Sequence, residues 1–298
     1  MSDFKPKGHL AMIAANAMWG LMSPAAKVVL TAGTVTPLLL TDMRIAGAAI
    51  LFWFTSLFTP YEKVPPGDLL RLAGAACLGI LFNQGCFIFG VGLSSPGEAS
   101  IITTTMPMWV MVLAALILEE PITWKKAGGI LLGASGAIML VSGNLGTQAT
   151  GNNPLLGDIL VLTAQLSYAL YLTLYRNFIR RYSLITLMKW MFLFATLILS
   201  IPSIPTVLAA PWASINTATW AGISFIVVGG TFVAYICVMI GQKNLRPTIV
   251  GMYNYLQPIV ATAIGIYMGF DHFTVLKTIA VLLIFTGVYL VTISKARQ

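Results

Sequence analysis

The chain has 298 residues, of which 58% are hydrophobic and only 9% are charged, and its mean hydropathy is +0.87. A soluble domain carries about 25% charged residues, so this composition excludes a globule whose whole surface faces water. The formal net charge of +8 does not indicate a nucleic-acid partner, because most of the basic residues lie in loops and tails on one side of the predicted membrane segments.

Ten apolar stretches follow one another along the chain, each near or above the ~20 residues that a helix needs to cross the hydrocarbon core. Helices are expected rather than barrel strands, because such strands span only about 10 residues and because a helix bonds its own backbone polar groups. In chain order the stretches are 9–31, 36–58, 69–92, 97–118, 123–142, 156–178, 184–208, 218–241, 248–268 and 273–294. The sequence therefore predicts an all-α polytopic membrane protein with ten transmembrane helices.

Lysines and arginines indicate how these helices are oriented. The loops that share a side with the N-terminus hold most of the basic residues, whereas the connections 143–156 and 209–217 contain none. By the positive-inside rule, both termini are expected in the cytoplasm, with the chain in a cell inner (plasma) membrane. Lys5 and Lys7 precede the first stretch as in a signal peptide, but that stretch is longer than a signal-peptide core and nine more follow, so we expect it to be retained.

The two halves of the chain repeat one another. Ungapped shifts of 151 and 149 positions align residues of the same kind in both halves. The aligned pairs are Pro96 with Pro247, Pro107 with Pro258, Asn16 with Gln165 and Trp19 with Tyr168. Each unit, 1–145 and 146–298, holds five predicted helices, an odd number, so the second unit must enter the membrane from the opposite side. This predicts two inverted five-helix repeats, an arrangement common among secondary transporters.

Short motifs occur at characteristic places in these units. The first stretch contains NAMWG at 16–20, and EEPIT at 119–123 joins the fourth and fifth stretches, whereas its copy GFDHFT at 269–274 has His272 in place of proline. With the repeat, which covers essentially the whole chain, these motifs resemble the drug/metabolite transporter superfamily, specifically its EamA-type ten-helix exporters. The resemblance implies a central cavity lined by helices one, three, four, six, eight and nine, and export of amino acids, metabolites or drugs.

Polar side chains inside the apolar stretches are candidates for the transport pathway, because a polar group in the membrane must face a cavity or another polar group. Asn16 and Trp19 share a helical face, and Gln165 and Tyr168 recur at the matching place. Hydrogen bonding between helices is the alternative role. The predicted substrate-binding residues are Asn16, Trp19, Gln84, Thr103, Gln165, Tyr168, Tyr235, Asn254 and Gln257.

Prolines inside the stretches are candidate hinges. Pro107 cannot donate to the carbonyl of Thr103, and Pro258 likewise frees that of Asn254. Such breaks can bind substrate or bend, and a kink that only improves packing is the alternative. The predicted hinges are Pro24, Pro107 and Pro258.

Few charged residues lie inside the stretches. Arg44 and Lys189 occupy roughly corresponding places in the second and seventh, and a structural role is expected for Arg44 rather than binding of a substrate carboxylate. His9 and His272 fall at the membrane interfaces, which gives no support for a proton relay. A close helix contact, within the chain or between the protomers of a homodimer, is expected from the small residues Gly129, Gly133 and Gly136.

Together these features predict an alternating-access exporter of amino acids or other small amphipathic metabolites, which would bind in a polar and aromatic cavity. Efflux of drugs or cations is the alternative, and a solute channel is a further one. An enzyme is not expected, because the sequence offers no buried carboxylate pair, no nucleophile with a base and no Walker-type loop. No cofactor, metal or nucleic-acid partner is predicted, and the expected partners are a small-molecule substrate and the lipid bilayer.

Overall fold

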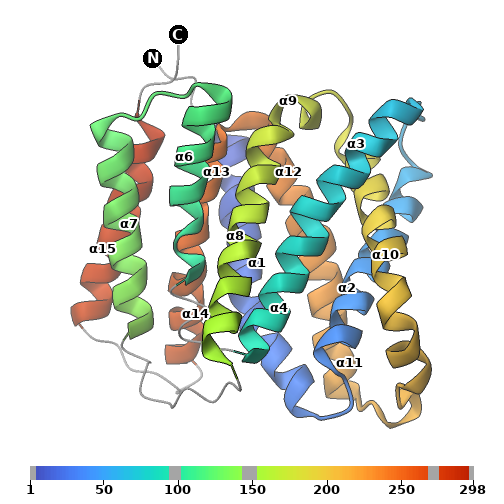
Figure 1. The fold of residues 1–298 in the computed structure, drawn as a ribbon. Coiled ribbons are helices and arrows are strands. Elements are labelled where there is room, and N and C mark those ends of the chain that lie inside the picture. The colour runs from blue at the N-terminus through green and yellow to red at the C-terminus, as the bar shows by residue number, and fades with distance from the viewer. Residues whose placement is uncertain (1–4, 94–101, 143–152, 268–274, 295–298) are drawn as a thin grey trace.

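A computed structural model describes residues 5–93, 102–142, 153–267 and 275–294, and Figure 1 shows them as one bundle of helices. No β-strand occurs within these ranges. Two of the features discussed above, Pro96 and the segment 269–274, lie outside the described residues.

The described residues of the first half form five helical rods. The third rod is composite, because a π-helical segment joins two α-helices. In chain order the elements are α1 (Pro6–Thr31), α2 (Pro37–Ser56), α3 (Pro66–Ala76), the π-helix η1 (Cys77–Phe82), α4 (Asn83–Leu93), α6 (Met106–Leu118) and α7 (Trp124–Ser142).

The second half repeats this order. Its third rod again contains a π-helix, and its fourth is interrupted by a 3₁₀ turn. The elements are α8 (Pro154–Leu174), the short α9 (Arg176–Ile179), α10 (Leu184–Ala209), the 3₁₀ turn η2 (Trp212–Ser214), α11 (Thr217–Ser224), the π-helix η3 (Phe225–Val233), α12 (Ala234–Asn244), α13 (Pro247–Met252), the 3₁₀ turn η4 (Tyr253–Tyr255), α14 (Leu256–Tyr267) and α15 (Val275–Thr292).

Local sequence determines where many of these helices begin. Proline occupies the first turn of α1, α2, α3, α6, α8 and α13, where its missing N–H has no intrahelical partner in any case. At the starts of α2, α8, α10 and α11, a capping side chain accepts a hydrogen bond from a backbone N–H of the first turn; these caps are Thr36, Asn153, Ser183 and Asn216. The turns between neighbouring rods are therefore specified locally.

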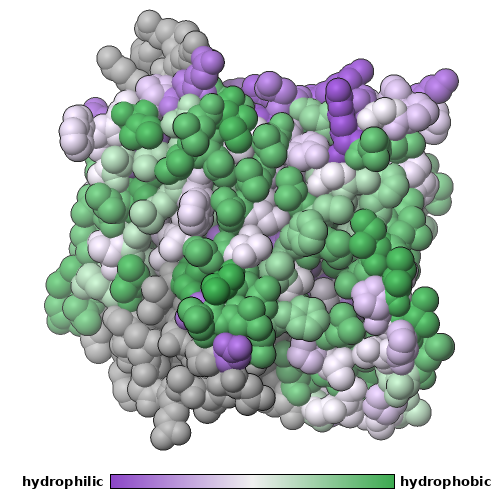
Figure 2. Space-filling model, viewed as in Figure 1, coloured by the Kyte–Doolittle hydropathy of each residue, from purple (hydrophilic) through white to green (hydrophobic). Residues whose placement is uncertain are grey.

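The outside of the bundle is apolar. Five of the described rods are long and apolar enough to cross a membrane, and Met106–Leu118 and Thr278–Thr292 are shorter apolar helices. Leu116, Ile201 and Leu208 are 74%, 77% and 80% exposed. Figure 2 shows hydrophobic residues over most of the face in view, with hydrophilic residues gathered at the end where α1 begins and α15 ends, which we call the terminal end. Such a surface suits lipid, and the predicted all-α polytopic membrane protein is confirmed.

The two halves pack against each other in an exchanged pattern. The first rods, α1 and α8, run in opposite directions (Figure 1). The first rod of each half packs on the third rod of the other, α1 on α12 and α8 on α4, while α2 packs on α10 and α7 on α15. A β-carbon at Gly129 would meet the Gly287 carbonyl oxygen, and one at Gly136 would meet that of Ala280. The close contact predicted for the glycines of α7 therefore lies within the chain.

Candidate functional site

A hydrogen bond between equivalent residues of the two halves lies inside the bundle. Gln84 Nε2, at the start of α4, donates to Tyr235 Oη, at the start of α12, at 2.7 Å. The two residues are 151 positions apart, which is the shift that aligns the halves. Both are buried. The pair therefore joins the third rods of the two halves.

Gln84 and Tyr235 are each the second residue after a π-helix. The shift of 151 carries η1 to positions 228–233, inside η3, so the same irregularity occurs at the same place in each half. Ser167 Oγ of α8 donates to the Leu78 carbonyl in η1 at 2.7 Å, and Trp19 Nε1 of α1 donates to the Gly230 carbonyl in η3 at 3.0 Å. Each π-helix is therefore held by the first rod of the opposite half. π-helical turns occur frequently at functional sites.

Arg44 and Trp19 surround the Gln84–Tyr235 pair. Arg44 Nε donates to Thr231 Oγ1 at 3.2 Å, and the guanidinium interacts electrostatically with Tyr235. The Trp19 ring meets the Tyr235 ring edge-on with centroids 5.9 Å apart. We call these five residues, Trp19, Arg44, Gln84, Thr231 and Tyr235, the central cluster. It combines one cation, hydrogen-bonding groups and aromatic rings drawn from both halves.

A second group, the amide cluster, joins α1 to the rod formed by α13, η4 and α14. Gln257 Nε2 donates to Asn16 Oδ1 at 3.0 Å and to Asn254 Oδ1 at 3.3 Å. Asn16 is fully buried and donates from Nδ2 to the Met12 carbonyl at 2.8 Å. The three amides of Asn16, Asn254 and Gln257, which the sequence identified separately, thus form one hydrogen-bonded unit.

His9 lies close to the amide cluster. Its Nδ1 is hydrogen-bonded to the hydroxyl of Tyr253, the residue before Asn254, at 2.6 Å. The side chain is 8% exposed and lies in the first turn of α1, at the terminal end of the bundle. Its partner belongs to η4, which connects this histidine to a helix break.

The two halves break a helix at equivalent positions. Residues 104–105 form a turn before α6, and η4 interrupts the fourth rod of the second half at 253–255. Pro107 and Pro258 follow these breaks within α6 and α14, and Thr103 immediately precedes the first of them. The backbone of α1, in contrast, continues as a helix through Pro24, whose side chain lies outside the described part.

Two of the predicted site residues, Gln165 and Tyr168, lie on α8, and Tyr168 interacts electrostatically with Tyr235 of the central cluster. Tyr168 accepts a hydrogen bond from Gln242 Nε2 at 3.4 Å, and Tyr171 Oη donates to Gln242 Oε1 at 3.2 Å. Gln165 is buried on the same helix. Sequence analysis missed Tyr171 and Gln242; the signal available was a tyrosine three positions after Tyr168 and an amide at the end of the eighth stretch.

A buried group of charges, the terminal ion cluster, joins the halves at the terminal end. Glu120, which is 5% exposed, pairs with Lys126 Nζ at 3.0 Å and with Arg176 Nη1 at 3.2 Å. Thr248 Oγ1 of α13 donates to Glu120 Oε2 at 3.1 Å. Sequence analysis missed this cluster, although the EEPIT motif contains Glu120. Because Arg176 and Thr248 belong to the second half, the cluster links it to the α6–α7 connection of the first.

Two further acids contact the second half at the terminal end. Asp68 pairs with Arg181 at 2.9 Å and accepts a hydrogen bond from the Tyr182 hydroxyl. Glu62 Oε2 accepts from the Ser183 backbone N–H at 2.9 Å. Burial works to raise the pKa of Glu62, but hydrogen bonds from Ser183 and Thr186 outweigh it and leave the pKa below its usual range. All three contacts tie the α2–α3 region to the segment between α9 and α10.

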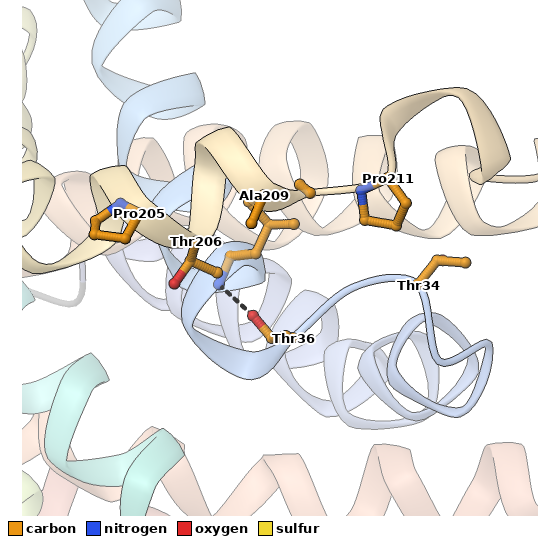
Figure 3. A pocket seen from close by; sticks show the side chains of 8 residues that line it. Thr34, Thr36, Pro205, Thr206, Ala209 and Pro211 are labelled. Carbon is orange, nitrogen blue, oxygen red and sulfur yellow. Dashed lines mark hydrogen bonds between the residues drawn. The ribbon is translucent and has the colours of Figure 1, made fainter.

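A cavity of about 350 Å³ lies at the opposite end of the bundle, between the α1–α2 connection and the end of α10 (Figure 3). Its lining residues are Thr34, Thr36, Leu39, Pro205, Thr206, Ala209, Ala210 and Pro211. None of these was predicted as a site residue. The central cluster and the amide cluster are packed and hydrogen-bonded internally, so the structure presents them in a closed arrangement.

Comparison with known proteins gives a consistent result. The sequence profile of the EamA-like transporter family matches residues 6–142 and again 155–293. The uncharacterized transporter YyaM of Bacillus subtilis is 23% identical over 263 residues, covering 87% of this chain and 85% of its own length. The uncharacterized inner membrane transporter YedA of Escherichia coli is 27% identical over 270 residues, covering 87% and 82%. A solved crystal structure shares the fold, with a TM-score of 0.81, 18% identity and 97% of both chains covered.

Proposed function

Because this chain belongs to the EamA-like transporter family, within the drug/metabolite transporter superfamily, we propose that it is an alternating-access exporter of small amphipathic metabolites, amino acids foremost. The chain is a membrane transporter; its direction, substrate and mechanism are the proposal. We place it in the inner (plasma) membrane with both termini in the cytoplasm, which the concentration of basic residues at the terminal end supports.

The Gln84–Tyr235 hydrogen bond is the observation that carries this proposal. Two five-helix repeats of opposite orientation, meeting at that pair, can exchange their conformations and so give outward-facing and inward-facing states of similar free energy. The exchanged helix contacts and the equivalent π-helices and helix breaks support this symmetry. A site between the two halves stays in place while access to it changes.

The contacts at the terminal end define one of the two states. Glu120, Asp68 and Glu62 each bridge the first half to the second there, so solute reaches the central cluster from that end only after these contacts separate. In the proposed topology, these contacts close the pathway toward the cytoplasm. An alternating cycle requires a second state in which these contacts are broken.

Counterflow measures the proposed activity directly. Purified protein in vesicles loaded with unlabelled amino acids should accumulate the labelled compound from outside, with saturation and with selectivity among substrates. Gln84→Ala and Asn254→Ala should reduce the exchange rate without altering membrane insertion, and Lys63→Gln, which removes a charge from an exposed loop, should leave it unchanged. Selective conductance without exchange would indicate a channel, and exchange restricted to organic cations would indicate the efflux alternative.

A further inference from the structure

Arg44 is a buried cation in the middle of α2. It is 8% exposed, and its interactions with the described residues are the hydrogen bond to Thr231 and the electrostatic contact with Tyr235. None of the ion pairs among the described residues includes it. Asp42, on the same helix, instead accepts a hydrogen bond from Ser203 at 2.7 Å. The two terminal amino groups of the guanidinium therefore lack an acceptor within the described part of the chain.

The other deeply buried cations of the described chain have counterparts. Lys126 pairs with Glu120 at 3.0 Å, and the Lys189 ammonium lies over the Trp53 ring at 5.0 Å from its centroid. A charge inside a membrane protein normally pairs with another charge or marks a substrate pathway. Because Arg44 lies in the central cluster, where the third rods of the two halves meet, the second explanation fits it.

A buried acceptor belongs to Gln84, the residue that donates a hydrogen bond to Tyr235. Gln84 Nε2 donates to the Tyr235 hydroxyl, whereas Gln84 Oε1 is buried without a hydrogen-bond partner among the described residues. Buried polar atoms are rarely left without a partner, so this oxygen lacks a donor in the closed state. Within the described residues, the central cluster thus contains a cation that lacks an anion and an acceptor that lacks a donor, and both residues interact with Tyr235.

We propose that Arg44 and Gln84 recognise a substrate that carries a carboxylate with an amino or hydroxyl group next to it. The terminal amino groups of Arg44 bind the carboxylate in a forked pair, and Gln84 Oε1 accepts a hydrogen bond from the adjacent donor. The Trp19 and Tyr235 rings contact the apolar remainder. The inference rests on the proposed transport function and narrows it to a substrate class; it gives Arg44 a binding role in place of the structural one that the sequence predicted.

Matched compounds separate the two recognition elements. Thermal unfolding of the full-length protein in phosphatidylcholine nanodiscs is measured with L-leucine, L-leucinamide, 4-methylpentanoate and isoamylamine, and with the corresponding set built on L-phenylalanine. The uncharged lipid removes anionic headgroups as an alternative ligand. We expect the amino acid to raise the melting temperature most, the acid without the amine less, and the amide and amine not at all.

Substitutions then assign the effect to residues. Arg44→Gln should weaken binding of the carboxylate compounds about 10- to 100-fold, as expected for loss of a charge-assisted pair. Arg44→Lys should retain part of the affinity, and Lys63→Gln should retain all of it. The melting temperature of ligand-free Arg44→Gln should stay unchanged or rise, because an unpaired buried charge has been removed; a large fall would assign Arg44 a structural role and overturn the proposal.

Two further results would contradict the inference alone. Equal stabilisation by the amino acid and its amide, or saturable exchange of uncharged compounds that Arg44→Gln leaves unchanged, would exclude carboxylate recognition while leaving transport intact. Glu98 lies outside the described residues and is an acid that could pair with Arg44. Glu98→Gln, alone and combined with Arg44→Gln, therefore tests whether the protein itself supplies a counter-charge to Arg44. Energetic coupling between the two substitutions in the ligand-free protein would overturn the proposal, whereas absence of saturable flux for every compound would instead contradict the proposed function.

Discussion

Replacing Glu120 by glutamine should destabilise the protein more than any change to an exposed ion pair. Glu120 is 5% exposed and its partner Lys126 is 1% exposed, so the substitution leaves a buried ammonium without its counter-ion. It also removes the charge that Arg176 faces at 3.2 Å and the acceptor of Thr248 at 3.1 Å. Breaking one partner of a buried ion pair costs about 3–5 kcal/mol, so we expect a loss of this size in the free energy of unfolding.

Unfolding of the purified protein in mixed micelles at increasing denaturant gives this free energy. The matched control is Arg71→Gln, whose side chain is 65% exposed and pairs with Asp68 at 3.4 Å, and for which we expect a loss of less than about 1 kcal/mol. The double variant Glu120→Gln/Lys126→Met should recover much of the loss, because it removes the uncompensated charge as well. A single Glu120→Gln variant as stable as Arg71→Gln would refute the reasoning.

Three further predictions concern other contacts between and within the halves. Gln84→Leu and Tyr235→Phe remove the same 2.7 Å hydrogen bond, so each should lower the free energy of unfolding by about 0.5–1.5 kcal/mol. The double variant should lose no more than either single variant, because the bond can be removed only once. Fully additive losses would show that the bond does not couple the two residues. Gly287→Ala should destabilise the protein by about 1–3 kcal/mol in thermal unfolding, because the added β-carbon would overlap the α7 backbone. The control Gly67→Ala adds a β-carbon in open space and should not destabilise the protein. Equal melting temperatures of the two variants would contradict the α7–α15 contact. The pKa of Glu62 is lowered in the folded protein, so ionised Glu62 stabilises the fold above its unfolded pKa of about 4.3, and this stabilisation is lost as pH falls through the folded pKa. Glu62→Gln should therefore make the free energy of unfolding less dependent on pH in the acidic range. An unchanged pH dependence would show that the Glu62 contacts are not formed.

Sequence reasoning predicted the parts of this fold that depend on periodicity and length. An apolar run of ~20 residues in a chain with so few charges forms a membrane-spanning helix, because a helix satisfies its own backbone polar groups. The predicted helices and their order were therefore confirmed. The boundaries were less well predicted, since α1 starts at Pro6 and α3 at Pro66, before the apolar runs begin. Prolines at the first turn mark both starts, and they determine the boundary more reliably than hydropathy.

The candidate site was partly predictable, for a different reason. Asn16, Asn254 and Gln257 were identified as isolated polar groups inside apolar stretches, and the structure joins them. Which polar groups meet depends on the packing of distant helices, and a single sequence does not contain that information. Arg44 beside Tyr235 and Glu120 beside Thr248 are contacts between helices far apart in the chain, so neither could be predicted from spacing.

The π-helices were not predicted, because a π-helix differs from an α-helix in its hydrogen-bond register and has no strong compositional signal. The positions of the π-helices provide a further comparison between the two halves. The shift of 151 positions carries η1 to 228–233, inside η3, and the turn at 104–105 to 255–256, at the end of η4, so the halves share local irregularities as well as prolines. Agreement of this kind in backbone detail is stronger support for two equivalent units than any single residue match.

Locking the terminal end tests alternating access most directly. In a protein whose native Cys77, Cys86 and Cys237 are replaced by alanine, cysteines at Glu62 and Ser183 are bridged with a short bifunctional thiol reagent; in the native protein the Glu62 carboxylate accepts a hydrogen bond from the Ser183 backbone N–H at 2.9 Å. If access alternates, the bridge should abolish exchange across vesicles, and reduction of a cleavable reagent should restore it. Undiminished exchange with the bridge in place would show that solute crosses without separating the halves at this end, and would contradict the account.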